Sequence, residues 1–171
     1  TGKENTAIGT QTLRANTEGS SNIGIGHYAL RCNVTGEKNV AVGVAALACN
    51  LGNGNTAIGY CALRSNTTGV NTAIGTCALK LNTTGIENVA IGFNSMVNNS
   101  AGGCNTAVGH TSLNFNTTGK NNTALGFCTL RSNLTGNYNT GFGKDNLLFV
   151  TTGSGNTAIG STALNKNTTG S

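Results

Sequence analysis

The chain has 171 residues with ten basic and five acidic side chains, a net charge of +5, and only 5% aromatic residues. It contains no run of about 18 apolar residues, so the sequence predicts no membrane-spanning helix. Its low charge and strict periodicity argue against a disordered chain, while abundant glycine and the absence of proline and tryptophan are unlike an ordinary globular core.

One phrase of about 17 residues repeats along the whole chain. It is clearest at 55–69, where Asn-Thr-Ala-Ile-Gly is followed by Tyr-Cys-Ala-Leu-Arg-Ser and then by Asn-Thr-Thr-Gly. Its copies begin at Asn5, Asn22, Asn39, Asn55, Asn71, Asn88, Asn105, Asn122, Asn139 and Asn156, with spacings of 17 or 16 residues. Such a period indicates stacked units that bury their apolar faces on one another. We expect residues 1–171 to be a single repeat segment and, because no atypical capping repeat is visible, a slice of a longer array.

The first half of each repeat predicts a short strand. Counting from the opening asparagine, position 2 is Thr, Val or Ile and position 4 is always apolar, as in Ile58 and Ile74. Side chains alternate along a strand, so positions 2 and 4 share one face, which we expect to point into the coil. The small residues at position 3 and the glycine at position 5 then lie on the opposite face.

The second half of each repeat predicts another strand and a turn. Position 9 is Leu in nine repeats and Met96 in the other, which indicates a second short strand with its side chain inward. The asparagine at position 12, replaced by Val150 in one repeat, opens an Asn-Thr-Thr-Gly turn. The two single-residue deletions, at 50–52 and after Gly69, fall in this turn, where loops tolerate them. The asparagines at positions 1 and 12 are expected to form ladders along the stack.

Two strands and two turns per repeat predict an all-β solenoid of ten coils. Each coil offers a thin core against an ordering cost of about 1–2 kcal/mol per residue, so additional burial must come from elsewhere. The small residues at positions 3 and 5 would let another backbone approach closely. We therefore expect chains to associate side by side with closed symmetry, along a seam that includes Ala57, Gly59, Ala73 and Gly75.

The Asn-(Thr/Val)-Ala-Ile-Gly phrase, with a small residue and leucine after it, resembles the head repeats of trimeric autotransporter adhesins. It is also similar to repeats in long bacteriophage and virus fibre proteins. The resemblance covers the whole chain, although the repeat here is longer by the Asn-Thr-Thr-Gly extension. It implies a left-handed parallel β-roll, three chains packed side by side, and a rigid head that binds a host or matrix receptor. It implies no catalytic residues.

The six cysteines allow two interpretations. Cys32 and Cys49 both occupy position 11 of neighbouring repeats, and Cys61 and Cys77 both occupy position 7. Neighbouring coils place their Cα atoms within disulfide range, but side chains in such a column point the same way, so the dihedral angle that a bridge needs is not guaranteed. Free, partly buried thiols are the other interpretation. Zinc-ligand spacing is absent, and we expect no metal site.

Position 10 forms a basic stripe, which holds Arg14, Arg31, Arg64, Lys80 and Arg131. Such a stripe could bind an acidic glycan or another anionic surface. It could equally be a solvated edge whose charge prevents sheets from aggregating. No aromatic residues interleave with it as single-strand binding would require, so nucleic acid is not expected.

Other motifs carry weaker signals. Asn-x-Ser/Thr triplets at 33, 66, 82, 116, 133 and 167 fit N-glycosylation, but the turn chemistry of the repeat generates the same triplets. His27 and His110 share position 6 five repeats apart, and the acidic residues are scattered, so no acid–base pair can be assigned. We expect no enzyme and no cofactor.

The sequence thus predicts a structural or adhesive fibre segment of a cell-surface adhesin, extracellular filament or virion fibre. Its partners would be copies of itself and a host or matrix glycan or protein receptor. A glycan-binding rod that uses the basic stripe is one alternative. An ice-binding surface is another, but it needs outward threonine ladders, and an inward position 2 counts against it.

Overall fold

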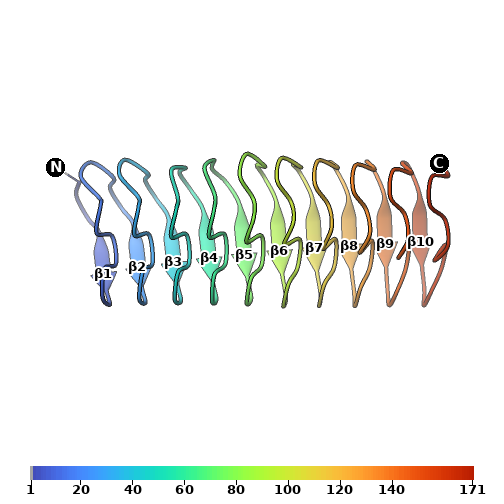
Figure 1. Cartoon of the computed structure of the whole chain (residues 1–171), viewed down its shortest axis with the longest axis horizontal. Coiled ribbons are helices and arrows are strands. Elements are labelled where there is room, and N and C mark those ends of the chain that lie inside the picture. The colour runs from blue at the N-terminus through green and yellow to red at the C-terminus, as the bar shows by residue number, and fades with distance from the viewer. Residues whose placement is uncertain (1) are drawn as a thin grey trace.

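The computed structural model describes residues 2–171 as one continuous stack of ten coils (Figure 1). Each coil contributes one short strand, and the ten strands lie side by side along the length of the molecule from the N-terminal to the C-terminal end. The strands are β1 (Thr6–Ile8), β2 (Ile23–Ile25), β3 (Val40–Val42), β4 (Thr56–Ile58), β5 (Thr72–Ile74), β6 (Val89–Ile91), β7 (Thr106–Val108), β8 (Thr123–Leu125), β9 (Thr140–Phe142) and β10 (Thr157–Ile159). The prediction of an all-β solenoid is confirmed.

The strands form one parallel sheet in which every strand pairs with its neighbours in sequence. Equivalent positions of successive coils are in register, as Thr72 pairs with Val89 and Ile74 with Ile91. The register persists across both 16-residue repeats, so the turns absorb the deletions.

The fourth coil shows where its missing residue lies. The side-chain amide of Asn55 donates a hydrogen bond to the Thr68 carbonyl, whereas the equivalent asparagine of other coils donates to a glycine carbonyl, as Asn71 does to Gly85. The missing residue therefore precedes Thr68, rather than following Gly69 as expected.

The second predicted strand is wrong. Positions 6–11 form a tight turn in every coil, with left-handed backbone at positions 7 and 9, as at Cys77 (φ 58°) and Leu79 (φ 49°). This backbone lets the amides of positions 7 and 9 bond in opposite directions. The Cys77 amide donates to the Tyr60 carbonyl of the preceding coil (2.8 Å), and the Leu79 amide donates to the Ser95 carbonyl of the following coil (3.0 Å). Satisfied backbone groups offset the cost of non-glycine residues at positive φ.

The predicted orientation of the strand is also wrong, because position 3 points into the coil while positions 2 and 4 point out. The alanines at position 3, such as Ala57 and Ala73, are fully buried, whereas Ile58 is 39% exposed. Position 9 is inward as predicted, and the position 9 leucines from Leu30 to Leu147 are completely buried together with Met96. The narrow core accommodates one large side chain per coil, so only small residues fit opposite the leucine.

A size match between coils supports this assignment. Position 8 is Ala or Ser in seven coils, threonine at Thr12 and Thr129, and asparagine at Asn146. After each threonine the next coil has glycine in place of alanine at position 3, at Gly24 and Gly141. A Cβ on Gly141 would lie 2.4 Å from the Thr129 methyl carbon, so the glycine accommodates the larger threonine.

Two buried asparagine ladders run along the stack, as expected. At position 1, the side-chain oxygen of Asn88 accepts the backbone amide of Asn105 (3.1 Å) and its side-chain amide (3.2 Å). At position 12, the side-chain amide of Asn99 donates to the side-chain oxygen of Asn82 (2.7 Å) and to the Gly102 carbonyl (2.9 Å). Each ladder therefore ties one coil to the next and closes the turn within a coil.

The position 12 ladder is interrupted at Val150, which is fully buried. The preceding rung, Asn133, has a buried side-chain oxygen without a hydrogen-bond partner in the described chain. Replacing Val150 with asparagine should supply the missing donor and raise the free energy of unfolding by about 1 kcal/mol. Urea denaturation would measure the gain, with Val150→Thr as the control that has nearly the same size but no amide. Equal stability of the two variants would contradict the ladder argument.

Candidate functional site

The most extensive candidate surface is the outward side of the sheet, which we call the strand face and define as positions 2 and 4 of all ten strands. Position 4 is apolar throughout, and its exposed fraction reaches 59% at Ile8, 55% at Phe142 and 71% at Ile159. In the middle of the stack, Ile74 and Ile91 are half-buried by their neighbours on adjacent strands. No residue of β1 to β10 is charged, so the strand face is a long, uncharged surface.

The predicted seam residues lie elsewhere. Ala57 and Ala73 are fully buried in their own coils and cannot contact another chain. Gly59 and Gly75 are partly exposed, but the space above each is filled by the next coil: a Cβ on Gly75 would lie 2.5 Å from the Gly92 carbonyl oxygen. These positions are small because of contacts within the chain.

The basic stripe is a real column on the surface, separate from the strand face. Arg14, Arg64 and Arg131 are exposed, and Arg31 and Lys80 are half-buried. A shallow open depression of about 390 Å³ lies between the first two arginines, lined by Arg14, Ala15, Arg31 and Cys32. A hydrogen bond to the Cys32 side chain is the main cause that raises the pKa of Arg31, which remains fully charged.

Two members of the basic stripe lie against aromatic rings, so the expectation that no aromatic residue lies beside the stripe is wrong. The Arg31 guanidinium carbon is 5.0 Å from the centre of the Tyr28 ring, and that of Arg131 is 5.5 Å from the centre of the Phe115 ring. His27 stacks on Tyr28 with the ring centres 3.6 Å apart. These contacts hold the guanidinium groups near the surface.

All six cysteines are free thiols in the described structure. Neither candidate disulfide, Cys32–Cys49 or Cys61–Cys77, is formed. Burial is the main cause that raises the pKa of Cys49, and a hydrogen bond to Glu87 is the main cause that raises the pKa of Cys104. Both thiols are therefore protonated at neutral pH, the opposite of what a nucleophilic cysteine needs.

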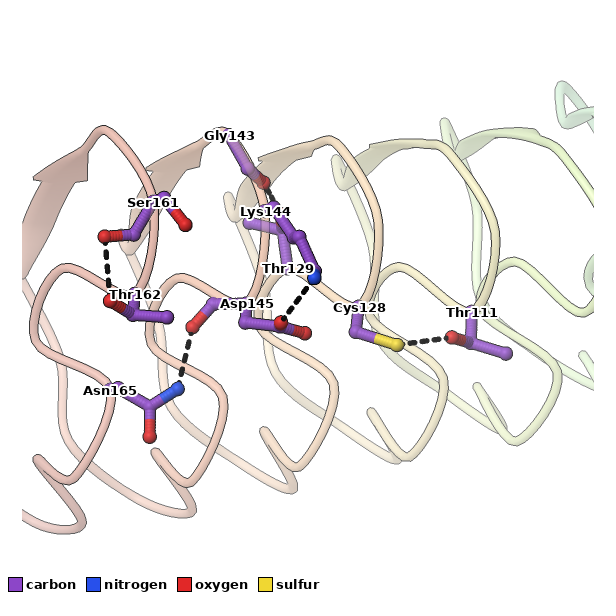
Figure 2. Close-up of polar contacts among 9 residues, drawn as sticks. All are labelled: Thr111, Cys128, Thr129, Gly143, Lys144, Asp145, Ser161, Thr162 and Asn165. Atoms are coloured by element: carbon purple, nitrogen blue, oxygen red, sulfur yellow. Dashed lines mark hydrogen bonds and ion pairs between the residues drawn. The ribbon is translucent and has the colours of Figure 1, made fainter.

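The structure reveals a column at position 6 that the sequence analysis did not identify. Phe93, His110 and Phe127 stack on successive coils with ring centres 5.2 Å apart, and the Lys144 amine lies 6.0 Å from the Phe127 ring. Figure 2 shows that Lys144 also pairs with Asp145 (3.8 Å). The sequence places these aromatic residues at the same position of successive repeats. Only the in-register stacking of the coils shows that their rings are in contact.

The same figure shows how neighbouring polar side chains join adjacent coils. The Thr111 hydroxyl contacts the Cys128 thiol (2.9 Å), and the Asn165 side-chain amide donates to the Asp145 carbonyl (2.8 Å) (Figure 2). These contacts link equivalent or nearby positions of successive coils, so they stabilise the stack. Within residues 2–171, no group of three or more His, Cys, Asp or Glu side chains is arranged to hold a metal ion.

Most of the Asn-x-Ser/Thr triplets cannot accept a glycan in the folded chain. Five of the six acceptor asparagines at position 12 are fully buried, and their side chains belong to the position 12 ladder: Asn33, Asn66, Asn82, Asn116 and Asn133. Turn chemistry therefore accounts for these triplets.

No helix in residues 2–171 has the length and hydropathy of a membrane-crossing segment. Comparisons with protein-family models, with curated proteins and with solved structures found no match to this chain. Its classification therefore rests on the fold itself, a parallel β-solenoid with one strand per coil.

Proposed function

We propose that this chain is a stiff segment of a structural or adhesive fibre on a cell surface, in an extracellular filament or on a virion. The stack of ten in-register coils supports this role, because backbone bonds and two asparagine ladders, one of them interrupted at Val150, connect successive coils. A rod of this kind acts mechanically by holding whatever it carries at a distance. It has no catalytic role in this proposal.

The observation that carries the proposal is the strand face. Ten strands present uncharged, largely apolar side chains on one continuous surface, and a patch of that extent on a soluble protein marks an interaction site. The occupant that fits it is another copy of the same chain, since only a partner with the same coil spacing can match every rung. We assign three copies, side by side, from the resemblance to trimeric adhesin heads. The seam thus moves from positions 3 and 5 to positions 2 and 4.

Light scattering of the purified chain tests this assignment, and the expected mass is that of a trimer. The double substitution Ile74→Glu and Ile91→Glu places charges on adjacent rungs of the strand face and should dissociate the trimer, because an unpaired buried charge is costly. The matched control is Thr118→Glu with Thr135→Glu, which adds the same charge on exposed turns and should leave the mass unchanged. A monomeric wild-type chain would overturn the proposal, and a dimer would overturn the number three.

One observation favours a second candidate, an ice-binding surface. Position 2 points outward and is threonine on seven strands, at Thr6, Thr56, Thr72, Thr106, Thr123, Thr140 and Thr157. Adjacent rungs are about 4.7–4.9 Å apart, close to a lattice repeat of ice. This function needs the strand face free in water, so it competes with assembly. A monomer that shows thermal hysteresis, lost on Thr106→Lys, would favour ice binding over the fibre.

A further inference from the structure

The basic stripe has a property that the strand face does not share: its surroundings contain no carboxylate over the first five coils. Arg14, Arg31, Arg64 and Lys80 make no ion pair in residues 2–171. Four of the five acidic residues lie at positions 14, 16 and 17, in the turn that follows the position 12 ladder: Glu4, Glu18, Glu37 and Glu87. The fifth, Asp145, is on the ninth coil and pairs with Lys144 (3.8 Å).

The columns that flank the stripe are neutral along the same coils. Position 10 lies beside position 7, as the contact of Arg31 with Tyr28 and the bond of Asn114 to the Asn94 carbonyl (2.7 Å) demonstrate. From the first coil to the fifth, position 7 is Gln, Tyr, Ala, Cys and Cys, and position 11 is Ala, Cys, Cys, Ser and Leu. If the basic side chains of the stripe served only to keep the rod soluble, acidic residues at the neighbouring positions 7 and 11 would serve equally well. Positive charge here is instead uncompensated and arranged in a single row.

We propose that this row binds an acidic polysaccharide, with sulfate or carboxylate groups on the sugar chain contacting successive cations along the rod. Arg14 and Arg31 are one coil apart and line the shallow depression, and Arg31 and Arg64 are two coils apart, about 9–10 Å at the usual strand spacing. Two coils approximate the length of a disaccharide. Guanidinium groups suit such a ligand because they present several donors in a fixed fork.

The spacing favours a polysaccharide over a nucleic acid. Ala48 leaves a neutral gap between Arg31 and Arg64, which matches a polymer whose charged groups alternate with neutral ring surfaces. A single nucleic acid strand would need free aromatic faces for base stacking, but Tyr28 is in contact with both Arg31 and His27. The proposal does not depend on trimer formation, because no residue of the stripe belongs to a strand.

The test is the affinity of the intact chain for a heparin-derived oligosaccharide, measured by fluorescence anisotropy at low salt. The double substitution Arg31→Glu and Arg64→Glu should weaken binding more than about tenfold, and wild-type affinity should fall by roughly tenfold to a hundredfold between 50 and 200 mM salt. The matched control, Lys38→Glu with Lys120→Glu, makes the same change in net charge on exposed turns and should alter the affinity less than about threefold.

Three results would overturn the proposal: no binding by the wild-type chain, equal losses in the stripe and control variants, or tighter binding of DNA than of the oligosaccharide. Arg31→Gln with Arg64→Gln guards against misfolding of the charge-reversal variant. It removes the charges while keeping polar side chains, and circular dichroism would verify its fold. It should also lose most of the affinity.

Discussion

Replacing Gly75 with valine should prevent the chain from folding, or lower its melting temperature by more than the truncation of a buried leucine would. Gly75 has φ +130°, a region that other residues rarely adopt and that costs about 1–3 kcal/mol to impose on them. In addition, a Cβ would lie 2.5 Å from the Gly92 carbonyl oxygen and 2.7 Å from its carbon, so the stacking of coils would have to change. Thr76→Val, on the outer side of the adjacent turn, should be tolerated.

The C-terminal coil allows the two causes to be separated. Gly160 occupies the same position with φ +114°, but nothing lies within 4 Å of a Cβ placed there. Alanine at Gly160 therefore introduces the backbone strain alone, whereas alanine at Gly75 introduces strain and the clash with the next coil. Thermal unfolding followed by circular dichroism should show a markedly larger loss for Gly75→Ala. Equal losses would remove the argument from coil contact.

Truncation of Leu79 to alanine should cost about 2–5 kcal/mol of unfolding free energy, because it leaves a cavity in a core with one large side chain per coil. Leu79 is fully buried between leucine and methionine rungs of the neighbouring coils. Ile74→Ala, five residues earlier on the strand face, should cost clearly less, since Ile74 is only half-buried in the chain.

Chemical denaturation of the two variants at equal concentration measures this contrast. The Leu79 variant should lose stability at any protein concentration, while the effect of Ile74→Ala should appear mainly in assembly. A larger loss for Ile74→Ala than for Leu79→Ala would contradict the orientation of the strand and restore the prediction that position 4 is interior.

Much of this fold follows from the sequence alone, because repetition and turn chemistry are local properties. The period set the number of coils, the recurring leucine identified the inward position 9, and the asparagines indicated the ladders that Asn88 and Asn99 illustrate. The sequence also predicted the basic stripe, since side chains at the same position of stacked repeats form one column. Only the structure showed that this column is separated from the carboxylates.

The inside and outside of the strand depended on the tertiary structure. Hydropathy predicts that Ile74 is buried and Ala73 is not, yet Ala73 is inside and Ile74 is outside. The coil is too narrow for isoleucine opposite Leu79, so side-chain volume, and not hydrophobicity, decides which face turns in. The left-handed backbone at positions 7 and 9 sets the cross-section of a coil. The residue types at these positions do not predict a left-handed backbone. For the same reason, the glycine at position 5 was recognised as a site of close approach, but only the stacked coils identified the Gly92 carbonyl as the group that approaches it.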